Sequence, residues 1–142
     1  PSLAIRHAFG RLGCFMNGCC YGRACDHFWA VRLESPPEIA HIPVHPTQLY
    51  EVFGLLDIFV TLLILEKLGR HPGYVICSYG ILYSVLRFIV EFFRGDVPHN
   101  LVLGRLTLAQ GICVGLFLVS WIVSVRLARQ HFKSRRREIL RT

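Results

Sequence analysis

The chain has few charged residues, and its first residues show none of the features of a secretion signal. Only 18% of its 142 residues are Asp, Glu, Lys or Arg, whereas 53% are hydrophobic. Soluble domains usually contain about 25% charged residues, so this composition disfavours a water-soluble protein. No initiator methionine, basic segment or small-residue cleavage site begins the sequence. We therefore expect residues 1–142 to be the C-terminal part of one longer domain.

Charged residues are nearly absent from three long apolar stretches. Two stretches contain two charged residues each, and the third contains none. Each is close to the roughly 20 residues that a helix needs to cross about 30 Å of hydrocarbon, and a helix pairs its own backbone groups, as a bilayer requires. The pattern predicts three transmembrane helices rather than buried helices of a soluble protein. The stretches are Leu49–Leu65, Tyr74–Phe93 and Leu106–Val125.

The segment from Leu3 to Tyr21 is apolar but less regular. Arg6, His7 and Arg11 interrupt it, and glycines recur from its middle onward. This pattern predicts a short, broken or re-entrant membrane-embedded segment rather than a full span. The predicted fold class is therefore all-α, a multi-spanning integral membrane helix bundle.

The basic residues are concentrated at the end of the chain. Sixteen Lys and Arg against nine Asp and Glu give a net charge of +7, and seven of the basic residues lie within 126–142. Because short cytoplasmic loops and tails collect Lys and Arg, the tail and the turn at 66–73 are expected inside, and the loops at 22–47 and 94–105 outside. A tail that binds nucleic acid is the alternative. Because the basic tail directly follows a predicted span, its charge is better explained by a cytoplasmic location. No nucleic-acid partner is therefore expected.

Polar residues of the three predicted spans fall at one outer level of the membrane. An ionised side chain at the centre of a membrane helix costs roughly 2.5–3.5 kcal/mol, so Arg87 should face a protein or water-filled interior and meet an anion. A structural Arg87–Glu91 pair without a ligand is the alternative. Residues spaced by four predict one stripe on the second span: Tyr79, Tyr83, Arg87 and Glu91. The other polar residues at this level are His45, Pro46, Thr47, Gln48, Glu51 and Gln110.

A segment rich in glycine and arginine runs from Gly10 to Arg23. Glycine lets backbone N–H groups approach a phosphate closely, and arginine offers it bidentate, charge-assisted hydrogen bonds. In a membrane protein, this combination predicts the binding of a phospholipid headgroup.

Three ordered motifs resemble those of the prolipoprotein diacylglyceryl transferases. The sequence His45–Glu51 is similar to the family's His-Pro-Ser/Thr-Gln-Leu-Tyr-Glu, and Gln110 falls where the family's last helix carries a Gln. The family's glycine-rich signature is matched by Gly10, Arg11, Gly13, Phe15, Asn17, Gly18 and Gly22. Its Tyr-x-x-x-Arg-Phe-x-x-Glu-x-x-Arg motif is matched by Tyr83, Arg87, Phe88, Glu91 and Arg94.

The resemblance implies a multi-pass enzyme of the bacterial cytoplasmic (inner) membrane. Such enzymes transfer the diacylglyceryl group of phosphatidylglycerol to the lipobox cysteine thiol of a prolipoprotein at the outer face, forming a thioether and releasing glycerol phosphate. The expected partners are phosphatidylglycerol, the signal peptide of a prolipoprotein with its lipobox, and the lipid bilayer. No cofactor is expected.

The resemblance also implies roles for individual residues. Arg11 and Arg87 are the expected catalytic residues, because negative charge accumulates on the departing phosphate and fixed cations stabilise it. Asn17 and Tyr83 are expected to orient the headgroup. The remaining expected substrate-binding residues are Gly18, Gly22, His45, Gln48, Glu91, Arg94 and Gln110. The family's His-Gly motif belongs to an earlier helix that this sequence lacks, so no general base is assigned.

Two residues depart from the family's pattern. Cys14 stands where the family has Asn, and Cys19 stands where it has Glu. A thiol reproduces neither the donor and acceptor of an amide nor the charge of a carboxylate. A noncatalytic lipid-binding or scaffold membrane protein of the same fold is therefore the alternative function.

Four of the six cysteines lie within 12 residues of one another. Their spacing does not match the ligand pairs of a tetrahedral zinc site, so no metal site is expected. A disulfide, which persists on the outer side of a membrane, unpaired thiols, and a less favoured metal or redox module all stay open. Cys77 and Cys113 lie inside predicted spans and are expected to be small core residues. The clustered cysteines are Cys14, Cys19, Cys20 and Cys25.

Overall fold

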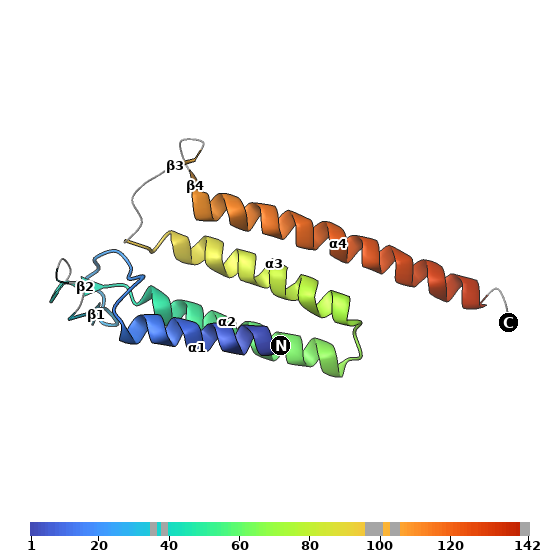
Figure 1. Ribbon diagram of the computed structural model, residues 1–142, viewed down its shortest axis with the longest axis horizontal. Helices are drawn as coiled ribbons and strands as arrows, with labels where there is room; N and C mark the ends of the chain where they lie inside the picture. The colour runs from blue at the N-terminus through green and yellow to red at the C-terminus, as the bar shows by residue number, and fades with distance from the viewer. Residues whose placement is uncertain (35–36, 38–39, 96–100, 103–105, 140–142) are drawn as a thin grey trace.

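The protein is a layer of long helices, of which the middle two are joined by a short turn and the others by longer segments (Figure 1). The computed structural model describes residues 1–34, 37, 40–95, 101–102 and 106–139. Within them, the helices are α1 (Ser2–Met16), α2 (Thr47–Lys67), α3 (Pro72–Glu91) and α4 (Leu108–Ile139). The strands of two residues each are β1 (Val31–Arg32), β2 (Pro43–Val44), β3 (Leu101–Val102) and β4 (Leu106–Thr107). The all-α membrane bundle predicted from the sequence is confirmed.

Three of these helices are long and apolar enough to cross a membrane: α2, α3 and residues 108–130 of α4. Their boundaries differ by a few residues from those predicted. Helix α3 begins at Pro72 because the His71 side chain accepts a hydrogen bond from the Gly73 backbone at 3.1 Å, an N-cap arrangement. It ends at Glu91 rather than Phe93. Helix α4 begins at Leu108, since the two preceding residues form β4.

Helix α1 is continuous, although glycines lie within it. Its 15 residues give a length of about 22 Å at about 1.5 Å per residue. The helix ends at Met16, and Gly18 then adopts a left-handed backbone with φ of 71°. The chain turns there into the loop that leads to α2.

Small residues let the helices approach closely. Ala4 and Ala8 of α1 are buried in a core with four larger apolar residues of α2 and α3: Leu55, Ile58, Leu62 and Val75. A Cβ at Gly80 would overlap the hydroxyl of Ser120, so this glycine sets the contact between α3 and α4. Such small-residue contacts are typical of membrane helices, which have no hydrophobic drive to associate in lipid.

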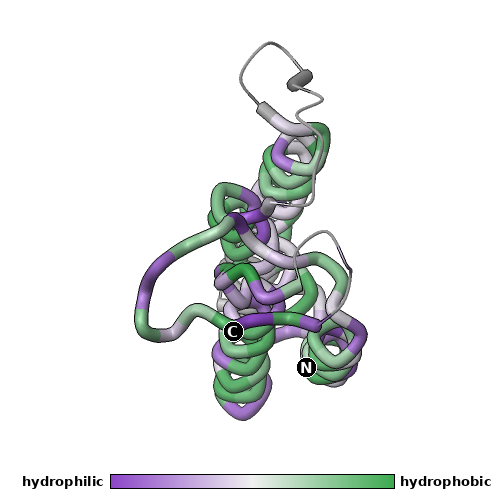
Figure 2. Tube along the Cα trace, turned by 90° about the vertical axis from the view of Figure 1, so that its left-hand side faces the viewer, coloured by the Kyte–Doolittle hydropathy of each residue, from purple (hydrophilic) through white to green (hydrophobic). Residues whose placement is uncertain are grey.

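Large apolar side chains cover the outside of the helices. Phe53, Ile76, Ile112 and Trp121 are all more than half exposed, and hydrophobic residues lie on every side of the helical turns in Figure 2. A soluble monomer rarely exposes contiguous apolar surface of this extent. The exposed faces therefore fit contact with lipid or with further membrane helices.

The loop between α1 and α2 is fastened to the end of α3. Strands β1 and β2 pair antiparallel, with Val31 opposite Val44, and a further bridge joins Gly22 to Arg94 just after α3. The C-terminal ends of α1 and α3 and the N-terminal ends of α2 and α4 thus lie at one end of the bundle (Figure 1). The expected outer loop at 94–105 and the last residues of the basic tail lie in part outside the described residues.

Candidate functional site

A buried glutamate joins three helices at this end of the bundle. Glu51, one turn into α2, is paired with two arginines through different oxygens. Arg11 Nε of α1 lies 2.5 Å from Oε2, and Arg87 Nη1 of α3 lies 2.9 Å from Oε1. The Glu51 side chain is 3% exposed, whereas the Arg11 and Arg87 side chains are 16% and 12% exposed. Both predicted catalytic residues are therefore together, and both keep some access from outside.

A second glutamate extends this network toward α4. Glu91 Oε2 lies 3.1 Å from Arg87 Nη2, so the predicted pair within α3 is present. The Thr107 hydroxyl donates to Glu91 Oε1 at 3.1 Å and accepts from the Gln110 backbone at 3.2 Å. The Gln110 side chain accepts from the Thr107 backbone at 3.1 Å. Gln110 thus holds the first turn of α4 against the charged network through Thr107.

The tyrosine stripe of α3 lies beside the same charges. Tyr79 and Tyr83 stack with ring centroids 5.8 Å apart, and the Tyr83 hydroxyl interacts with the Arg11 guanidinium. His7 of α1 lies against Tyr83, with a centroid distance of 4.9 Å, and its Nδ1 is 3.2 Å from the Tyr79 hydroxyl. The periodicity of α3 predicted the stripe, and the structure adds a histidine from the neighbouring helix.

Gln48 and Thr47 fix the loop that follows α1. Gln48 Nε2 donates to the Cys19 carbonyl and Thr47 Oγ1 to the Cys20 carbonyl, each at 2.8 Å. Gln48 Oε1 is buried and has no hydrogen-bond partner among the described residues. An unpaired buried acceptor is costly, so this atom suits a hydroxyl donor from a ligand or water.

Gly22 stands at a close crossing of three segments. Its N–H donates to the His45 carbonyl at 3.0 Å. A Cβ at this position would lie 2.6 Å from the His45 Cβ and 2.8 Å from the Phe93 carbonyl oxygen, so no other residue fits. The bridge to Arg94 begins here. Gly22 and Arg94 therefore position the loop through their backbones.

Aromatic side chains form a cavity of about 570 Å³ next to the charged network. His45 Nδ1 and Trp29 Nε1 both lie 3.0 Å from the Tyr50 hydroxyl, and His27 stacks on Trp29 with centroids 4.6 Å apart. Burial, with a smaller contribution from His27, lowers the pKa of His45 below its usual value, which favours the neutral ring. The lining residues are His27, Trp29, His45, Tyr50, Leu86, Ile89, Val90 and Phe93.

The predicted site residues therefore fall into two groups. Arg11, Arg87, Glu91 and Tyr83 meet at the buried network. Asn17 is exposed and caps α1 through its backbone. The other predicted residues hold the loop and the start of α4 in place around the network, some through the backbone and some through the side chain. They are Gly18, Gly22, His45, Gln48, Arg94 and Gln110.

The sequence analysis did not assign roles to His7, Trp29 or Thr107. One available signal was the spacing of His7, four residues before Arg11 and hence on the same face of α1. Trp29 lies in an irregular loop, where no periodicity indicates the direction of a side chain.

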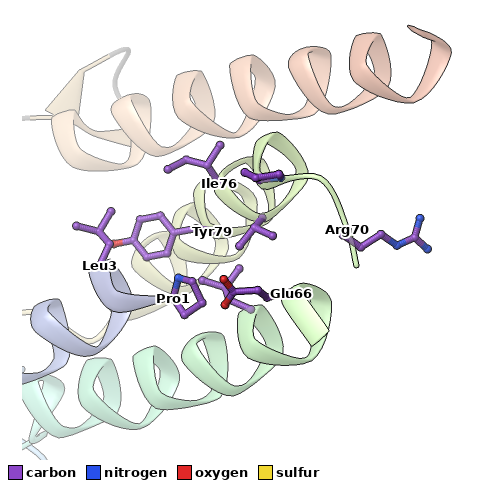
Figure 3. A pocket seen from close by; sticks show the side chains of 9 residues that line it. Pro1, Leu3, Glu66, Arg70, Ile76 and Tyr79 are labelled. Atoms are coloured by element: carbon purple, nitrogen blue, oxygen red, sulfur yellow. The ribbon is translucent and has the colours of Figure 1, made fainter. Parts of the chain in front are cut away.

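Another cavity, of about 230 Å³, lies at the opposite end of the bundle (Figure 3). Pro1, Leu3, Ile76 and Tyr79 border it, and Arg70 points away from it. None of the predicted site residues lines this cavity. The charged network therefore remains the candidate site.

The network holds two cations, Arg11 and Arg87, where an anion can reach them. A guanidinium has five N–H donors, and the ion pairs use one nitrogen of Arg11 and two of Arg87. Donors therefore remain for a phosphate oxygen that arrives from the exposed side. Glu51 keeps the two guanidinium groups in place, and Glu91 balances the second of them.

Comparison with known proteins identifies the family. The family model for prolipoprotein diacylglyceryl transferase matches residues 1–126. Relatives named phosphatidylglycerol–prolipoprotein diacylglyceryl transferase include one from Clostridium tetani, 42% identical over 70% of this chain and 41% of the relative. A second is from Finegoldia magna, 32% identical over 94% of this chain and 51% of the relative. A third is from Geobacter sulfurreducens, 34% identical over 92% of this chain and 50% of the relative. The chain spans about half the length of the curated relatives it matches, and it belongs to the prolipoprotein diacylglyceryl transferase family.

Proposed function

We propose that the protein transfers the diacylglyceryl group of phosphatidylglycerol to the lipobox cysteine of a prolipoprotein. The observation that carries this proposal is the convergence of Arg11 and Arg87, from separate helices, on one buried glutamate. Two partly accessible arginines at the end of apolar helices match the charge and depth of a phospholipid phosphate. The names of the relatives support this substrate and this acceptor.

In the proposed reaction, the acceptor thiol first gives its proton to a general base, for which this sequence has no assigned residue. The thiolate sulfur attacks the glyceryl carbon that carries the phosphate, a C–S bond forms, and the C–O bond to the phosphate breaks. Glycerol phosphate leaves with the electron pair of that bond, so negative charge grows on its oxygen. Arg11 and Arg87 stabilise this charge, because cations fixed in advance need not reorganise during the reaction.

The remaining residues hold the substrate and the two arginines. Glu51 aligns both guanidinium groups, and Tyr83 lies beside Arg11. The unpaired Gln48 Oε1 accepts from a hydroxyl of the glycerol headgroup. Asn17, Gly18, Gly22, His45 and Arg94 shape the loop over the site, while Gln110 supports it through Thr107. The aromatic cavity beside Tyr50 receives apolar parts of a substrate.

The charged network lies at the outer face of the membrane in this proposal. The basic tail after α4 and the turn between α2 and α3 then lie in the cytoplasm, in agreement with the excess of Lys and Arg in those segments. The acceptor cysteine of an exported prolipoprotein reaches the site from the outer side.

The second candidate is a noncatalytic lipid-binding protein of the same fold. Cys14 and Cys19 in place of the family's Asn and Glu favour it, and so does the pairing of Arg87 with two carboxylates at once. If these charges only stabilise the bundle, removing the charges of Arg87 and Glu91 together should leave thermal stability and lipid binding nearly unchanged, because apolar residues can replace a buried ion pair at little cost.

The test measures thioether formation by the purified full-length protein with phosphatidylglycerol and a lipobox peptide. Arg87→Lys keeps the charge but removes the planar fork of donors, so kcat should fall on the order of 100-fold or more with little change in thermal stability. Arg6→Lys, an exposed arginine on α1, is the matched control and should keep full activity. Normal turnover in Arg87→Leu, or full activity in the double variant Arg87→Leu, Glu91→Leu, would refute the catalytic role.

A further inference from the structure

Three cysteine sulfurs come together where α1 turns into the following loop. The Sγ atoms of Cys14, Cys19 and Cys20 all lie within 4.8 Å of one another, and all three residues are half-buried. Cys25, the fourth cysteine of this segment, is not part of the group. The proposed transfer reaction uses none of these sulfurs.

The turn after α1 brings the three cysteines together. Gly18 adopts a left-handed backbone after the last turn of the helix, an arrangement that commonly reverses the chain at a helix end. The Cys19 backbone N–H then donates to the Cys14 carbonyl at 3.1 Å. Positions five and six residues apart in the sequence therefore face the same point.

The backbone at Cys20 is held in an uncommon conformation. Its φ is 63°, a left-handed conformation that residues other than glycine rarely adopt. Buried Thr47 and Gln48 hold this part of the loop by hydrogen bonds of 2.8 Å to the Cys20 and Cys19 carbonyls. These contacts hold Cys19 and Cys20 in place after the end of α1.

The charge around the sulfurs suits metal binding. Each thiol must lose its proton to solvent when its sulfur bonds a metal ion, which places negative charge on the cluster. Arg11 interacts electrostatically with both Cys14 and Cys20, so a positive charge lies near the three sulfurs. Soft ions prefer such thiolate ligands over oxygen ligands.

We propose that Cys14, Cys19 and Cys20 form a three-sulfur site for a soft, thiolate-seeking metal ion, either Cu(I) or Zn(II). The spacing of the cysteines argues against a tetrahedral zinc site made by four protein ligands, and three sulfurs without Cys25 agree with that. Three sulfurs instead coordinate Cu(I) completely, or they hold Zn(II) with a water as its fourth ligand. The site adjoins Arg11 but is separate from the pairing of that residue with Glu51.

The test uses the purified full-length protein, reduced and kept free of oxygen. Cu(I) and Zn(II) are titrated separately, and in each titration the protein competes with a coloured chelator whose absorbance reports the free ion. We expect one ion per chain in at least one titration, with X-ray absorption showing three sulfur ligands. A Zn(II) site would add one oxygen ligand and a Cu(I) site would not, which distinguishes the two ions.

Variants assign the ligands. Cys20→Gly removes a sulfur at a position whose backbone favours glycine, so the protein should stay at least as stable while its affinity for the metal falls at least tenfold. Cys14→Ser and Cys19→Ser should weaken binding similarly. Cys25→Ser is the matched control, because it removes a half-buried cysteine of the same loop and should change nothing.

Three results would overturn the proposal. One is the absence of stoichiometric binding of either ion by the folded, reduced protein. Another is an equal loss of affinity in Cys25→Ser and Cys20→Gly. The third is a disulfide within the cluster that mass spectrometry still finds after reduction under folding conditions. Each of these readouts is independent of diacylglyceryl transfer.

Discussion

Glu51 is the residue on which the candidate site depends most. It comes from the first turns of α2, where its side chain is almost completely buried between guanidinium groups of α1 and α3. Burying a charge is costly unless opposite charges and hydrogen bonds compensate it. Here two arginines do so, and each arginine in turn depends on Glu51 for its place.

Glu51→Gln should therefore destabilise the protein strongly. The amide keeps the shape of the side chain but leaves both arginines without their shared anion, and breaking a buried pair in this way costs about 3–5 kcal/mol. Thermal unfolding of the purified protein in detergent measures the effect. Glu66→Gln, an exposed glutamate at the end of the same helix, should change stability by no more than about 0.5 kcal/mol. Equal stability of the two variants would show that the ion pairs of Glu51 do not stabilise the fold.

At the scale of the helices, the start of α4 is tied to the end of α3 by one hydroxyl. Thr107 Oγ1 donates to Glu91 and accepts from the first turn of α4. A threonine before a helix commonly plays the second role. The hydrogen bond that Thr107 donates to Glu91 links this helix cap to the charged network. The position of α4 and the charge of Glu91 therefore depend on each other.

Thr107→Val removes both hydrogen bonds and keeps the shape of the side chain. Loss of the cap alone costs about 0.5–2 kcal/mol, and the variant also withdraws a donor from buried Glu91. We expect a lower unfolding temperature and faster hydrogen exchange in the first turn of α4. Thr61→Val, an exposed threonine in the middle of α2, serves as the control. If both variants exchange and unfold like the parent protein, the hydroxyl does not hold α4.

At the scale of the whole molecule, the chain is a multi-pass protein of the bacterial inner membrane. Arg11, Glu51 and Glu91 belong to helix ends that lie at one end of the bundle, where the loop between α1 and α2 also lies (Figure 1). The other end carries the short turn after α2. The orientation of the protein therefore matters for function, because it decides from which side of the membrane substrates reach the site.

A labelling experiment tests the orientation. A cysteine introduced at Thr142 should react with a membrane-impermeant maleimide only after the cells are permeabilised, whereas one introduced at Asp26 should react in intact cells. The physical reason is the excess of Lys and Arg in the tail, which holds it in the cytoplasm. Labelling of the parent protein supplies the background from native cysteines. Reaction at Thr142 in intact cells would place the candidate site on the inner side.

The sequence was sufficient to predict the features that depend on composition and local spacing. Helices α2, α3 and α4 follow from apolar length, because lipid requires a helix to pair its own backbone groups. The stripe from Tyr79 to Glu91 follows from the helical repeat, since residues four apart share a face. The family resemblance indicated Arg11 and Arg87 as catalytic residues. The cost of a charge in lipid predicted that Arg87 meets an anion, and it pairs with Glu51 and Glu91.

Only the tertiary structure decided which groups meet across helices. The sequence indicated Glu91 as the partner of Arg87, one turn away, but Glu51 belongs to another helix, and its shared role depends on how closely α1, α2 and α3 pack. That approach is set by small residues such as Ala4 and Ala8 inside the core. The grouping of Cys14 with Cys19 and Cys20 depends likewise on a left-handed turn. Side-chain periodicity describes one helix at a time, whereas contacts between helices depend on crossing angle and register, which packing fixes only after the chain has folded.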